Sequence, residues 1–324
     1  MSRPERPLVL VAPELAALAG EAPGWPAGAE TRFARPGEGL GSGRGEDGQV
    51  VALVPLVSQP VGPAELDRYP ALEVVANYGV GYDNLDLAAL RARGVVATNT
   101  PDVLTDATAD LAVALLLAAA RRLREGLDLA RSGAWEGWHP TQLLGMGLRG
   151  RTLGLLGAGR IGRSTARRAR AFGMEVLYWD RSRSEELEAE LGATRAEALD
   201  GLLAASDAVS VHLPLTPETA GLLVADALGR MRREAVLVNT ARGGIVDPDA
   251  LADALRTGRL AAAGLDVFPD EPVIPEPLRE LPNCFVLPHL GSATREARGA
   301  MWELAASNVR AVLAGEGPRT PIPG

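Results

Sequence analysis

A short glycine-rich turn limits the fold of this chain more than any other feature. The apolar run Thr152–Leu156 leads directly into residues 157–162, which read GAGRIG, and a helical pattern follows. In this GxGxxG arrangement Gly157 permits a tight turn, Gly159 lets the backbone approach a pyrophosphate, and Gly162 lets the helix pack closely on the strand. The pattern predicts a strand–turn–helix unit that binds a dinucleotide. The first turn of its helix offers unpaired N–H groups to phosphate oxygens, and its residues include Arg160 and Ile161.

The residue expected to contact the adenosine ribose is Asp180. It follows the next predicted strand, Glu175–Trp179, at close to the spacing that such a unit requires. A carboxylate in this place accepts hydrogen bonds from the ribose hydroxyls and repels a 2′-phosphate, which favours NAD. Arg181, Ser182 and Arg183 follow directly, however, and a guanidinium can bind a 2′-phosphate through two parallel hydrogen bonds. We therefore expect NAD as the cofactor, with NADP as the alternative.

Short apolar runs alternate with helical patterns along most of the chain, which is typical of an α/β fold with parallel sheets. The predicted strands are Pro7–Val11, Val50–Val54, Glu73–Asn77, Val95–Thr98, Thr152–Leu156, Glu175–Trp179, Ala208–His212, Ala235–Asn239, Ala262–Val267 and Cys284–Leu287. The clearest predicted helices are Asp102–Arg122, Arg163–Phe172, Pro248–Thr257 and Ser292–Ala314. Asp247 can cap the third of these helices, and Pro248 suits its first position. Residues 20–48 are rich in Gly, Pro, Ala and Glu and are expected to be peripheral and to consist mainly of loop.

Charge and cysteine content exclude several classes of protein. The chain carries 33 Lys+Arg against 41 Asp+Glu, a net charge of −8, so we expect neither a nucleic-acid partner nor binding to an anionic membrane. Every one of the 33 basic residues is arginine, which excludes Schiff-base chemistry on lysine and a Walker-A phosphate loop. The single cysteine, Cys284, excludes an internal disulfide framework and a cysteine metal cluster, and no metal site is predicted.

No segment of the sequence indicates export or membrane insertion. The apolar run near the N-terminus is short and is broken by Pro13 and Glu14, so it does not read as a signal peptide. The most apolar stretch, Leu111–Ala120, has about half the length that spans a bilayer. We therefore expect a cytoplasmic protein, which a single cysteine also fits.

Three histidines are available as proton donors near neutral pH, and they are His139, His212 and His289. His289 lies between a predicted strand and the last helix, where α/β sheets bind ligands. His212 ends a predicted strand and suits a cofactor site equally well. His139 lies in a loop rich in Trp and Gly, and the residues alone do not decide among the three histidines.

Several longer stretches resemble a known family. Residues 239–247 (NTARGGIVD), 264–272 (GLDVFPDEP) and 288–294 (PHLGSAT) resemble signature stretches of the D-isomer-specific 2-hydroxyacid dehydrogenases, and they occur in family order after residues 157–162. Residues 79–86 (GVGYDNLD) and 100–110 (TPDVLTDATAD) further resemble the glyoxylate/hydroxypyruvate reductase branch. The resemblance implies reduction of a small 2-keto acid to the D-2-hydroxy acid by hydride transfer from NAD(P)H.

The resemblance also implies a catalytic set. His289 would give its proton to the carbonyl oxygen as hydride arrives. Glu271 would hydrogen-bond to His289, and a carboxylate partner favours the imidazolium form. Arg242 would hold the substrate carboxylate and polarise the keto oxygen, where negative charge develops.

Further residues take binding roles by the same resemblance. The N–H groups of Val80 and Gly81 would bind the substrate carboxylate, and Asp266 would orient the nicotinamide carboxamide. The residues expected to line the cofactor are His212, Thr216, Thr240 and Ala241. Trp138 resembles part of a loop that reaches toward the neighbouring subunit's substrate pocket.

The implied architecture is two Rossmann/flavodoxin-like domains with an interdomain cleft. The substrate-binding domain would be discontinuous, comprising residues 1–100 plus 291–324, and the dinucleotide-binding domain would comprise residues 101–290. The helix Asp102–Arg122 would link them and help to form a homodimer.

Other activities share these motifs. Phosphoglycerate dehydrogenases have them, but their long forms carry a further regulatory domain, whereas this sequence ends at Gly324. Formate dehydrogenases of this fold pair the histidine with glutamine, and Glu271 argues against that reaction. Phosphite dehydrogenases have a lysine where this chain has Val80, and this difference argues against phosphite oxidation. A non-catalytic NAD(H)-sensing protein of the corepressor type is the alternative from a different class.

Overall fold

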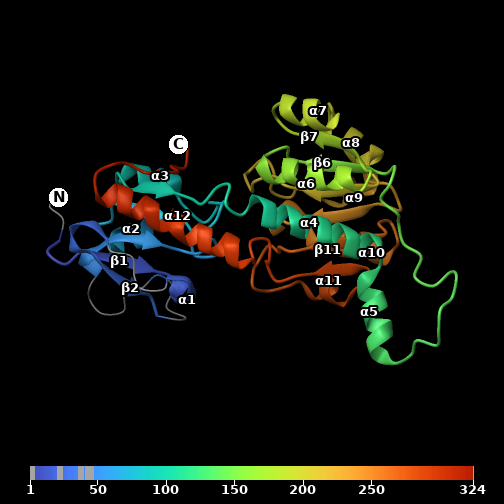
Figure 1. The fold of residues 1–324 in the computed structure, drawn as a ribbon, viewed down its shortest axis with the longest axis horizontal. Helices are drawn as coiled ribbons and strands as arrows, with labels where there is room; N and C mark the ends of the chain where they lie inside the picture. Colours follow the sequence, from blue (N-terminus) through green and yellow to red (C-terminus); the bar gives the residue numbers. More distant parts are fainter. Residues whose placement is uncertain (1–3, 20–24, 36–39, 41–46, 324) are drawn as a thin grey trace. The chain divides into compact units, whose positions relative to one another are not determined.

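The computed structural model describes residues 4–19, 25–35, 40 and 47–323, and it consists of two compact units (Figure 1). Unit 1 comprises Met1–Leu104 and Ala293–Gly324, and unit 2 comprises Thr105–Ser292. The predicted division at residues 100 and 291 lies close to these bounds. Its assignment of one part to substrate and the other to cofactor stays a prediction.

Unit 1 contains a parallel sheet of five strands. These are β1 (Leu8–Val11), β2 (Glu30–Phe33), β3 (Val50–Val54), β4 (Val74–Ala76) and β5 (Val96–Thr98). Their order is β2-β1-β3-β4-β5, which is the flavodoxin-like arrangement. Every residue of β1, β3 and β4 is buried, so these strands read as continuous apolar runs rather than as alternating ones.

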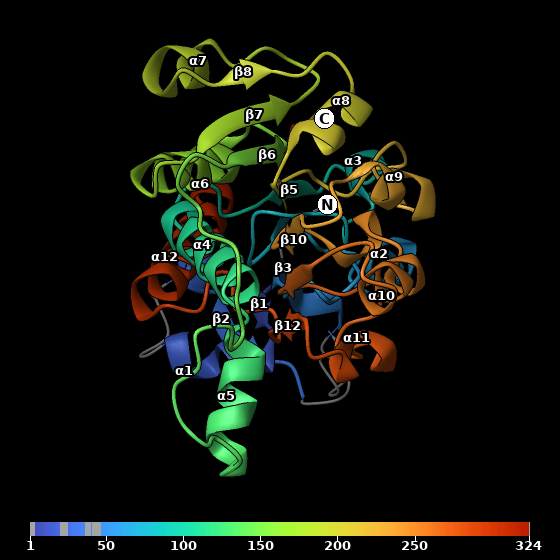
Figure 2. The ribbon, with the colours of Figure 1, turned by 90° about the vertical axis from the view of Figure 1, so that its right-hand side faces the viewer.

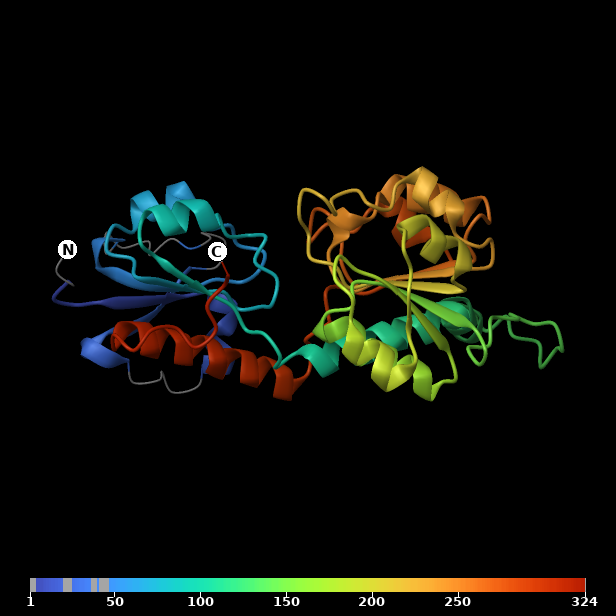
Figure 3. The same ribbon diagram turned by 90° about the horizontal axis from the view of Figure 1, so that it is seen from above.

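Helices cover both faces of this sheet. They are α1 (Ala16–Ala19), α2 (Pro63–Arg68), α3 (Leu87–Ala92) and α12 (Arg295–Leu313). Figure 3 shows α12, in red, on one face and α2 and α3 on the other. The Thr294 hydroxyl accepts a hydrogen bond from the Ala297 N–H and caps α12, so this helix begins three residues after the predicted start at Ser292.

The stretch of residues 20–48, which is expected to be mainly loop, also contains the strand β2. This strand pairs in parallel with β1 at the edge of the sheet. None of its residues is fully buried, so it has no continuous apolar run from which a strand is predicted. Residues 20–24, 36–39 and 41–46 of this stretch lie outside the described residues.

Unit 2 contains a parallel sheet of seven strands. These are β6 (Thr152–Leu156), β7 (Glu175–Trp179), β8 (Thr194–Arg195), β9 (Ala208–Val211), β10 (Val236–Asn239), β11 (Ala262–Leu265) and β12 (Cys284–Val286). Their order is β12-β11-β10-β9-β6-β7-β8. Successive strands therefore extend the sheet from β6 toward β8 and then, from β9 onward, on the other side of β6. Ligands bind in α/β sheets where the strand order reverses in this way.

The helices of unit 2 pack on both faces of its sheet, with α4 and α6 on one side and α9, α10 and α11 on the other (Figure 3). Their bounds are α4 (Thr105–Ala120), α5 (Leu123–Ser132), α6 (Arg160–Ala171), α7 (Glu185–Leu191), α8 (Leu199–Ala205), α9 (Ala225–Arg230), α10 (Pro248–Arg256) and α11 (Glu276–Glu280). The predicted cap of α10 is confirmed, because the Asp247 carboxylate accepts hydrogen bonds from the N–H groups of Asp249 and Ala250.

Two further predicted helices differ from the structure in their bounds. The helix expected at Asp102–Arg122 is shorter, since Asp102 and Arg122 have φ values of 70° and 53°, which a right-handed helix excludes. The helix expected from Arg163 begins at Arg160, directly after Gly159.

Helix α5 was not predicted, and it extends beyond the layers of unit 2 (Figure 2). It has no buried residue. The helix and the loop after it expose a group of large apolar side chains, which are Leu123, Leu127, Trp135, Trp138 and Leu144. Within the described part of the chain, no helix is both long and apolar enough to cross a membrane.

Candidate active site

The glycine-rich turn follows β6 and leads into α6. A Cβ atom on Gly157, whose φ is 100°, would lie 2.8 Å from the carbonyl oxygen of His212. A Cβ atom on Gly162 would lie 2.2 Å from the carbonyl oxygen of Gly157. A Cβ atom on Gly159 would have no atom within 4 Å. Packing therefore requires glycine at the first and last positions, whereas the middle glycine faces open space at the start of α6, as the approach of a pyrophosphate demands.

His212 follows β9, the strand beside β6 at the reversal of strand order. Its Nε2 atom lies 2.9 Å from the hydroxyl oxygen of Ser210, and burial lowers its pKa to about 4, so the ring is neutral near pH 7. Its Nδ1 atom is buried and has no hydrogen-bond partner among the described residues, and the same is true of the Thr240 hydroxyl after β10. Two unsatisfied buried polar atoms at the edge that carries the glycine-rich turn fit a bound dinucleotide.

Asp180 lies after β7, beside the same turn. Its Oδ2 atom accepts a hydrogen bond of 2.7 Å from the Ala158 N–H, and its Oδ1 atom accepts one of 3.3 Å from the Ser182 N–H. The guanidinium of Arg195 donates to the carbonyl oxygens of Asp180 and Arg181 over 3.0 and 3.1 Å and holds this segment. The expected acidic residue is thus fixed against the glycine-rich turn, and the exposed Arg181 follows it.

Arg183 differs from its neighbour because it forms an ion pair. Its Nη2 atom lies 2.6 Å from Oε2 of Glu188, the fourth residue of α7. A second hydrogen bond joins the Arg183 Nε atom to the same carboxylate oxygen over 2.8 Å. Arg181 is therefore the better candidate for binding a 2′-phosphate.

Glu271 and His289 lie after the adjacent strands β11 and β12. Nδ1 of His289 lies 2.7 Å from Oε2 of Glu271, and Oε1 of Glu271 accepts a hydrogen bond of 3.0 Å from the Phe268 N–H. Burial raises the pKa of the Glu271 carboxyl, but the His289 hydrogen bond and charge, the Phe268 N–H and the Arg242 charge outweigh it, so the pKa lies below its usual value. Glu271 is thus anionic at neutral pH and can accept a hydrogen bond from Nδ1–H of His289, which leaves Nε2 of His289 for a substrate.

Asp266 holds the loop that carries His289. It is completely buried, and its Oδ1 and Oδ2 atoms accept hydrogen bonds of 2.6 and 2.8 Å from the N–H groups of Leu290 and Gly291. Its carbonyl oxygen accepts one of 2.9 Å from the N–H of His289, whose φ is 55°. An aspartate in an apolar strand must have a partner if it is buried, and these backbone N–H groups are its partners. The expected contact of Asp266 with nicotinamide stays a prediction.

Arg242 lies in a turn after β10 that Asn239 stabilises. The Asn239 side chain donates to the Arg242 carbonyl oxygen over 2.9 Å and accepts from the Ala241 N–H over 3.0 Å. A Cβ atom on Gly243 would lie 1.9 Å from the Phe268 carbonyl carbon, so this turn packs tightly on the segment that leads to Glu271. Sequence reasoning missed Asn239, although an asparagine that ends a buried strand is a common turn-forming signal.

The structure brings most of the predicted residues of unit 2 to one edge of its sheet. Because β6, β9, β10, β11 and β12 are parallel, the segments that follow them share this edge. These segments carry the glycine-rich turn, His212 and Thr216, Thr240 to Arg242, Asp266 with Glu271, and His289. His139 is not among them, since its ring bonds to Thr141 in the exposed loop after α5.

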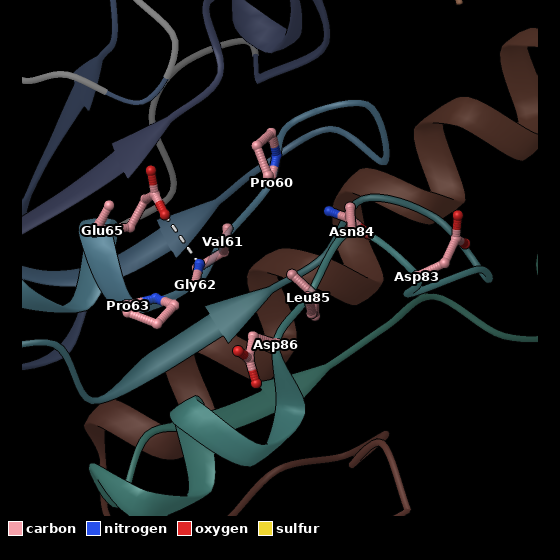
Figure 4. A pocket seen from close by; sticks show the side chains of 10 residues that line it. Pro60, Val61, Gly62, Pro63, Glu65, Asp83, Asn84, Leu85 and Asp86 are labelled. Carbon is pink, nitrogen blue, oxygen red and sulfur yellow. Dashed lines mark hydrogen bonds between the residues drawn. The ribbon is translucent and has the colours of Figure 1, made fainter. Parts of the chain in front are cut away.

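Unit 1 carries the predicted Val80 and Gly81 in the loop after β4. It also has a shallow hollow of about 350 Å³ between residues 60–65 and 83–86 (Figure 4). Three carboxylates border this hollow, and the dashed line in Figure 4 marks the bond from the Gly62 N–H to Glu65. Within the residues that the structure describes, no group of three or more His, Cys, Asp or Glu side chains is placed to hold a metal ion.

The chain is similar to enzymes of known name. Residues 113–291 match the family described as D-isomer specific 2-hydroxyacid dehydrogenase, NAD binding domain. The glyoxylate reductase of Thermococcus litoralis is 49% identical over 274 residues, which cover 83% of this chain and 82% of that protein.

Two solved structures are similar over nearly the whole length. A protein from Thermus thermophilus is 45% identical with a TM-score of 0.85 and covers 98% of this chain and 100% of its own. An NADPH-dependent glyoxylate/hydroxypyruvate reductase from Sinorhizobium meliloti, in complex with NADP and malonate, is 38% identical with a TM-score of 0.88 and covers 98% and 97% of the two chains. On this evidence the chain belongs to the D-isomer-specific 2-hydroxyacid dehydrogenase family.

Proposed function

We propose that this protein reduces glyoxylate or hydroxypyruvate to the corresponding D-2-hydroxy acid. The observation that carries the proposal is the 2.7 Å contact between Glu271 and His289 at the sheet edge that also presents the glycine-rich turn. A proton donor and a dinucleotide-binding turn are the two parts that a carbonyl reductase needs. The names of the relatives supply the substrate class.

The residues divide the reaction between them. NADH or NADPH, when bound at the turn, supplies the hydride to the keto carbon. His289 gives the proton on Nε2 to the carbonyl oxygen, so the product gains one hydride and one proton. Glu271 holds the opposite ring nitrogen and balances the imidazolium charge. Arg242 binds the substrate carboxylate and stabilises the negative charge that develops on the oxygen. The N–H groups of Val80 and Gly81 bind the carboxylate as well.

A matrix of small 2-keto acids against both cofactors tests this function. Loss of reduced-cofactor absorbance with glyoxylate or hydroxypyruvate supports the proposal, and the ranking of kcat/KM identifies the preferred pair. Absence of turnover with every 2-keto acid and either cofactor would exclude it. Cofactor binding without turnover would instead favour an NAD(H)-sensing protein, and preferred oxidation of 3-phosphoglycerate would favour the phosphoglycerate dehydrogenase alternative.

We also propose that the protein is a cytoplasmic homodimer. The apolar side chains exposed on α5 and the loop after it support a second copy as the partner, with Trp138 83% exposed. Light scattering during gel filtration tests the dimer, and Leu127→Asp should shift the mass to that of a monomer. Cell fractionation tests the location, which the single buried Cys284 fits.

A further inference from the structure

The loop after β4 contains adjacent backbone N–H groups that lack an acceptor. The N–H groups of Val80, Gly81 and Tyr82 donate no hydrogen bond to any described residue. Val80 and Gly81 are half-buried. A row of adjacent backbone donors with no acceptor among the described residues suits the oxygens of an anion.

The carbonyl oxygen of each of these peptides accepts a hydrogen bond from another residue of unit 1. The Gly79 carbonyl accepts a hydrogen bond of 2.9 Å from the Thr100 N–H. The Val80 carbonyl accepts one of 2.8 Å from Nδ2 of Asn99. The C=O and N–H of a trans peptide point in opposite directions. These two bonds therefore turn the N–H groups of Val80 and Gly81 away from Thr100 and Asn99.

A second amide holds the next peptide. Nδ2 of Asn77 donates to the Gly81 carbonyl over 2.7 Å, and Asn77 itself is completely buried. Asn84, seen in Figure 4, exchanges hydrogen bonds of 3.0 and 3.2 Å with Asn77. Its Nδ2 atom also donates to the carbonyl oxygens of Leu56 and Gln59 over 3.3 and 2.9 Å. The chain of amides thus ties the loop to the segment that follows β3.

The backbone of Asn99 is anchored in turn. The Thr320 hydroxyl donates to the Asn99 carbonyl over 2.7 Å, and the Asn99 N–H donates to the Thr320 carbonyl over 3.4 Å. Both the backbone and the side chain of Asn99 are therefore held by hydrogen bonds. A residue can orient another peptide only when it is itself held in this way.

We propose that Asn99 and Asn77 are positioning residues for substrate binding. Their side chains clamp the carbonyls of Val80 and Gly81, so that the N–H groups of this loop are preorganised for the substrate carboxylate. This inference rests on the proposed reduction of 2-keto acids and adds to it the residues that orient the carboxylate site. Neither asparagine touches the substrate in this proposal.

The variant Asn99→Ala tests the inference. Loss of the Asn99 side chain lets the Val80–Gly81 peptide rotate, so its N–H no longer points to the substrate carboxylate. We expect KM for glyoxylate to rise roughly tenfold, because the loss of one hydrogen bond to a charged group weakens binding by about this factor. We expect kcat and KM for the reduced cofactor to stay unchanged, because the carboxylate is bound equally in the ground state and the transition state. A merely structural role would instead lower the active fraction, and with it kcat, at unchanged KM for glyoxylate.

Two further variants keep the test decisive. Asn283→Ala is the matched control, because the Asn283 side chain likewise donates to backbone carbonyls, but in unit 2. Its two acceptors are the carbonyl oxygens of Leu255 and Ala261. This control variant should leave KM for glyoxylate unchanged. Asn99→Asp keeps the size of the side chain but replaces the donor by an acceptor, so it should raise KM for glyoxylate further than Asn99→Ala. An unchanged KM in both variants of Asn99 would overturn the proposal.

A readout without turnover separates this inference from the function on which it rests. Oxamate, a 2-keto acid analogue that is not reduced, is added to the uniformly ¹⁵N-labelled protein with NADH. The amide signals of Val80 and Gly81 should shift in the wild type and respond only at higher oxamate concentration in Asn99→Ala. Equal responses in both proteins would refute the positioning role even if glyoxylate is reduced. A wild type that reduces no 2-keto acid would instead refute the proposed function.

Discussion

Nδ1 of His289 and Oε2 of Glu271 lie 2.7 Å apart at the ends of two adjacent parallel strands, β12 and β11. The pairing of β11 with β12 brings the two segments together. The hydrogen bonds from the Phe268 N–H to Glu271 and from the His289 N–H to the Asp266 carbonyl oxygen then hold each segment in place. With Nδ1 committed to a carboxylate, the proton for transfer can reside only on Nε2. This contact favours the ring tautomer that the proposed role of His289 as proton donor requires.

Glu271→Gln should lower kcat for glyoxylate reduction by roughly a hundredfold, since a neutral amide does not favour the protonated imidazole. Wild-type activity should persist on the acid side until Glu271 is protonated, at a pH below its ordinary value of about 4.3, because its pKa is lowered. The measurement is the pH profile of kcat/KM for both proteins. Glu280→Gln, on the exposed face of α11, is the control and should behave as wild type. Equal rates in Glu271→Gln and wild type would contradict the assigned role.

Asp207 provides a test on stability rather than activity. It is 8% exposed and accepts hydrogen bonds of 2.8, 3.2 and 2.9 Å from Arg232, Arg151 and the Thr152 N–H. Burial raises the pKa of Asp207, but the Thr152 N–H and the two arginines outweigh it, so the pKa is lowered. The ionised form therefore stabilises the fold above the unfolded pKa of about 3.9, and this contribution is lost as pH falls through the lower folded value.

Asp207→Asn should reduce the free energy of unfolding at pH 7 by about 1–2 kcal/mol and weaken its dependence on acid pH. Chemical denaturation between neutral and acid pH measures both effects. Asp253→Asn, whose side chain is 74% exposed beside Arg256, should leave the free energy within about 0.5 kcal/mol of wild type. An equal decrease in the free energy of unfolding in both variants would show that the buried contacts of Asp207 stabilise the fold no more than an exposed ion pair does.

The cofactor preference depends on Asp180 and Arg181. Asp180→Ser should raise kcat/KM for NADPH relative to NADH roughly tenfold, because the carboxylate that repels a 2′-phosphate is removed while serine can still bond to the ribose. Arg181→Ala should lower the same ratio, whereas Arg183→Ala should leave it unchanged, since Arg183 is paired with Glu188. Ratios that do not move in Asp180→Ser would refute the contact with the ribose.

Patterns local in sequence were sufficient to predict most of the fold. Strands such as Val50–Val54 are buried on both faces of a parallel sheet, so they appear in the sequence as continuous apolar runs. Such a run predicts the strand without knowledge of the strands that pair with it. The exposed edge strand β2 has no such run. The clamp of Asn99 on Val80 joins residues 19 positions apart, and the bond of Asp266 to Gly291 joins residues 25 apart. Only the folded chain brings such donors and acceptors together, so the sequence predicted Val80, Gly81 and His289 as site residues but not that Asn99 and Asp266 hold the loops that carry them.

Gly162 and Gly159 of the turn should respond differently to the same change. Gly162→Ala places a methyl group against the Gly157 carbonyl oxygen, with 2.2 Å available, so strand and helix must separate and the free energy of unfolding should fall by about 1–3 kcal/mol. Gly159→Ala meets no atom within 4 Å, so the melting temperature should stay near that of wild type. Its methyl group occupies the space that a pyrophosphate needs, and KM for the reduced cofactor should rise at least tenfold. Thermal unfolding and cofactor titration separate the two effects. Tight cofactor binding by Gly159→Ala would mean that the phosphates lie elsewhere, even though the turn keeps the geometry of a dinucleotide site.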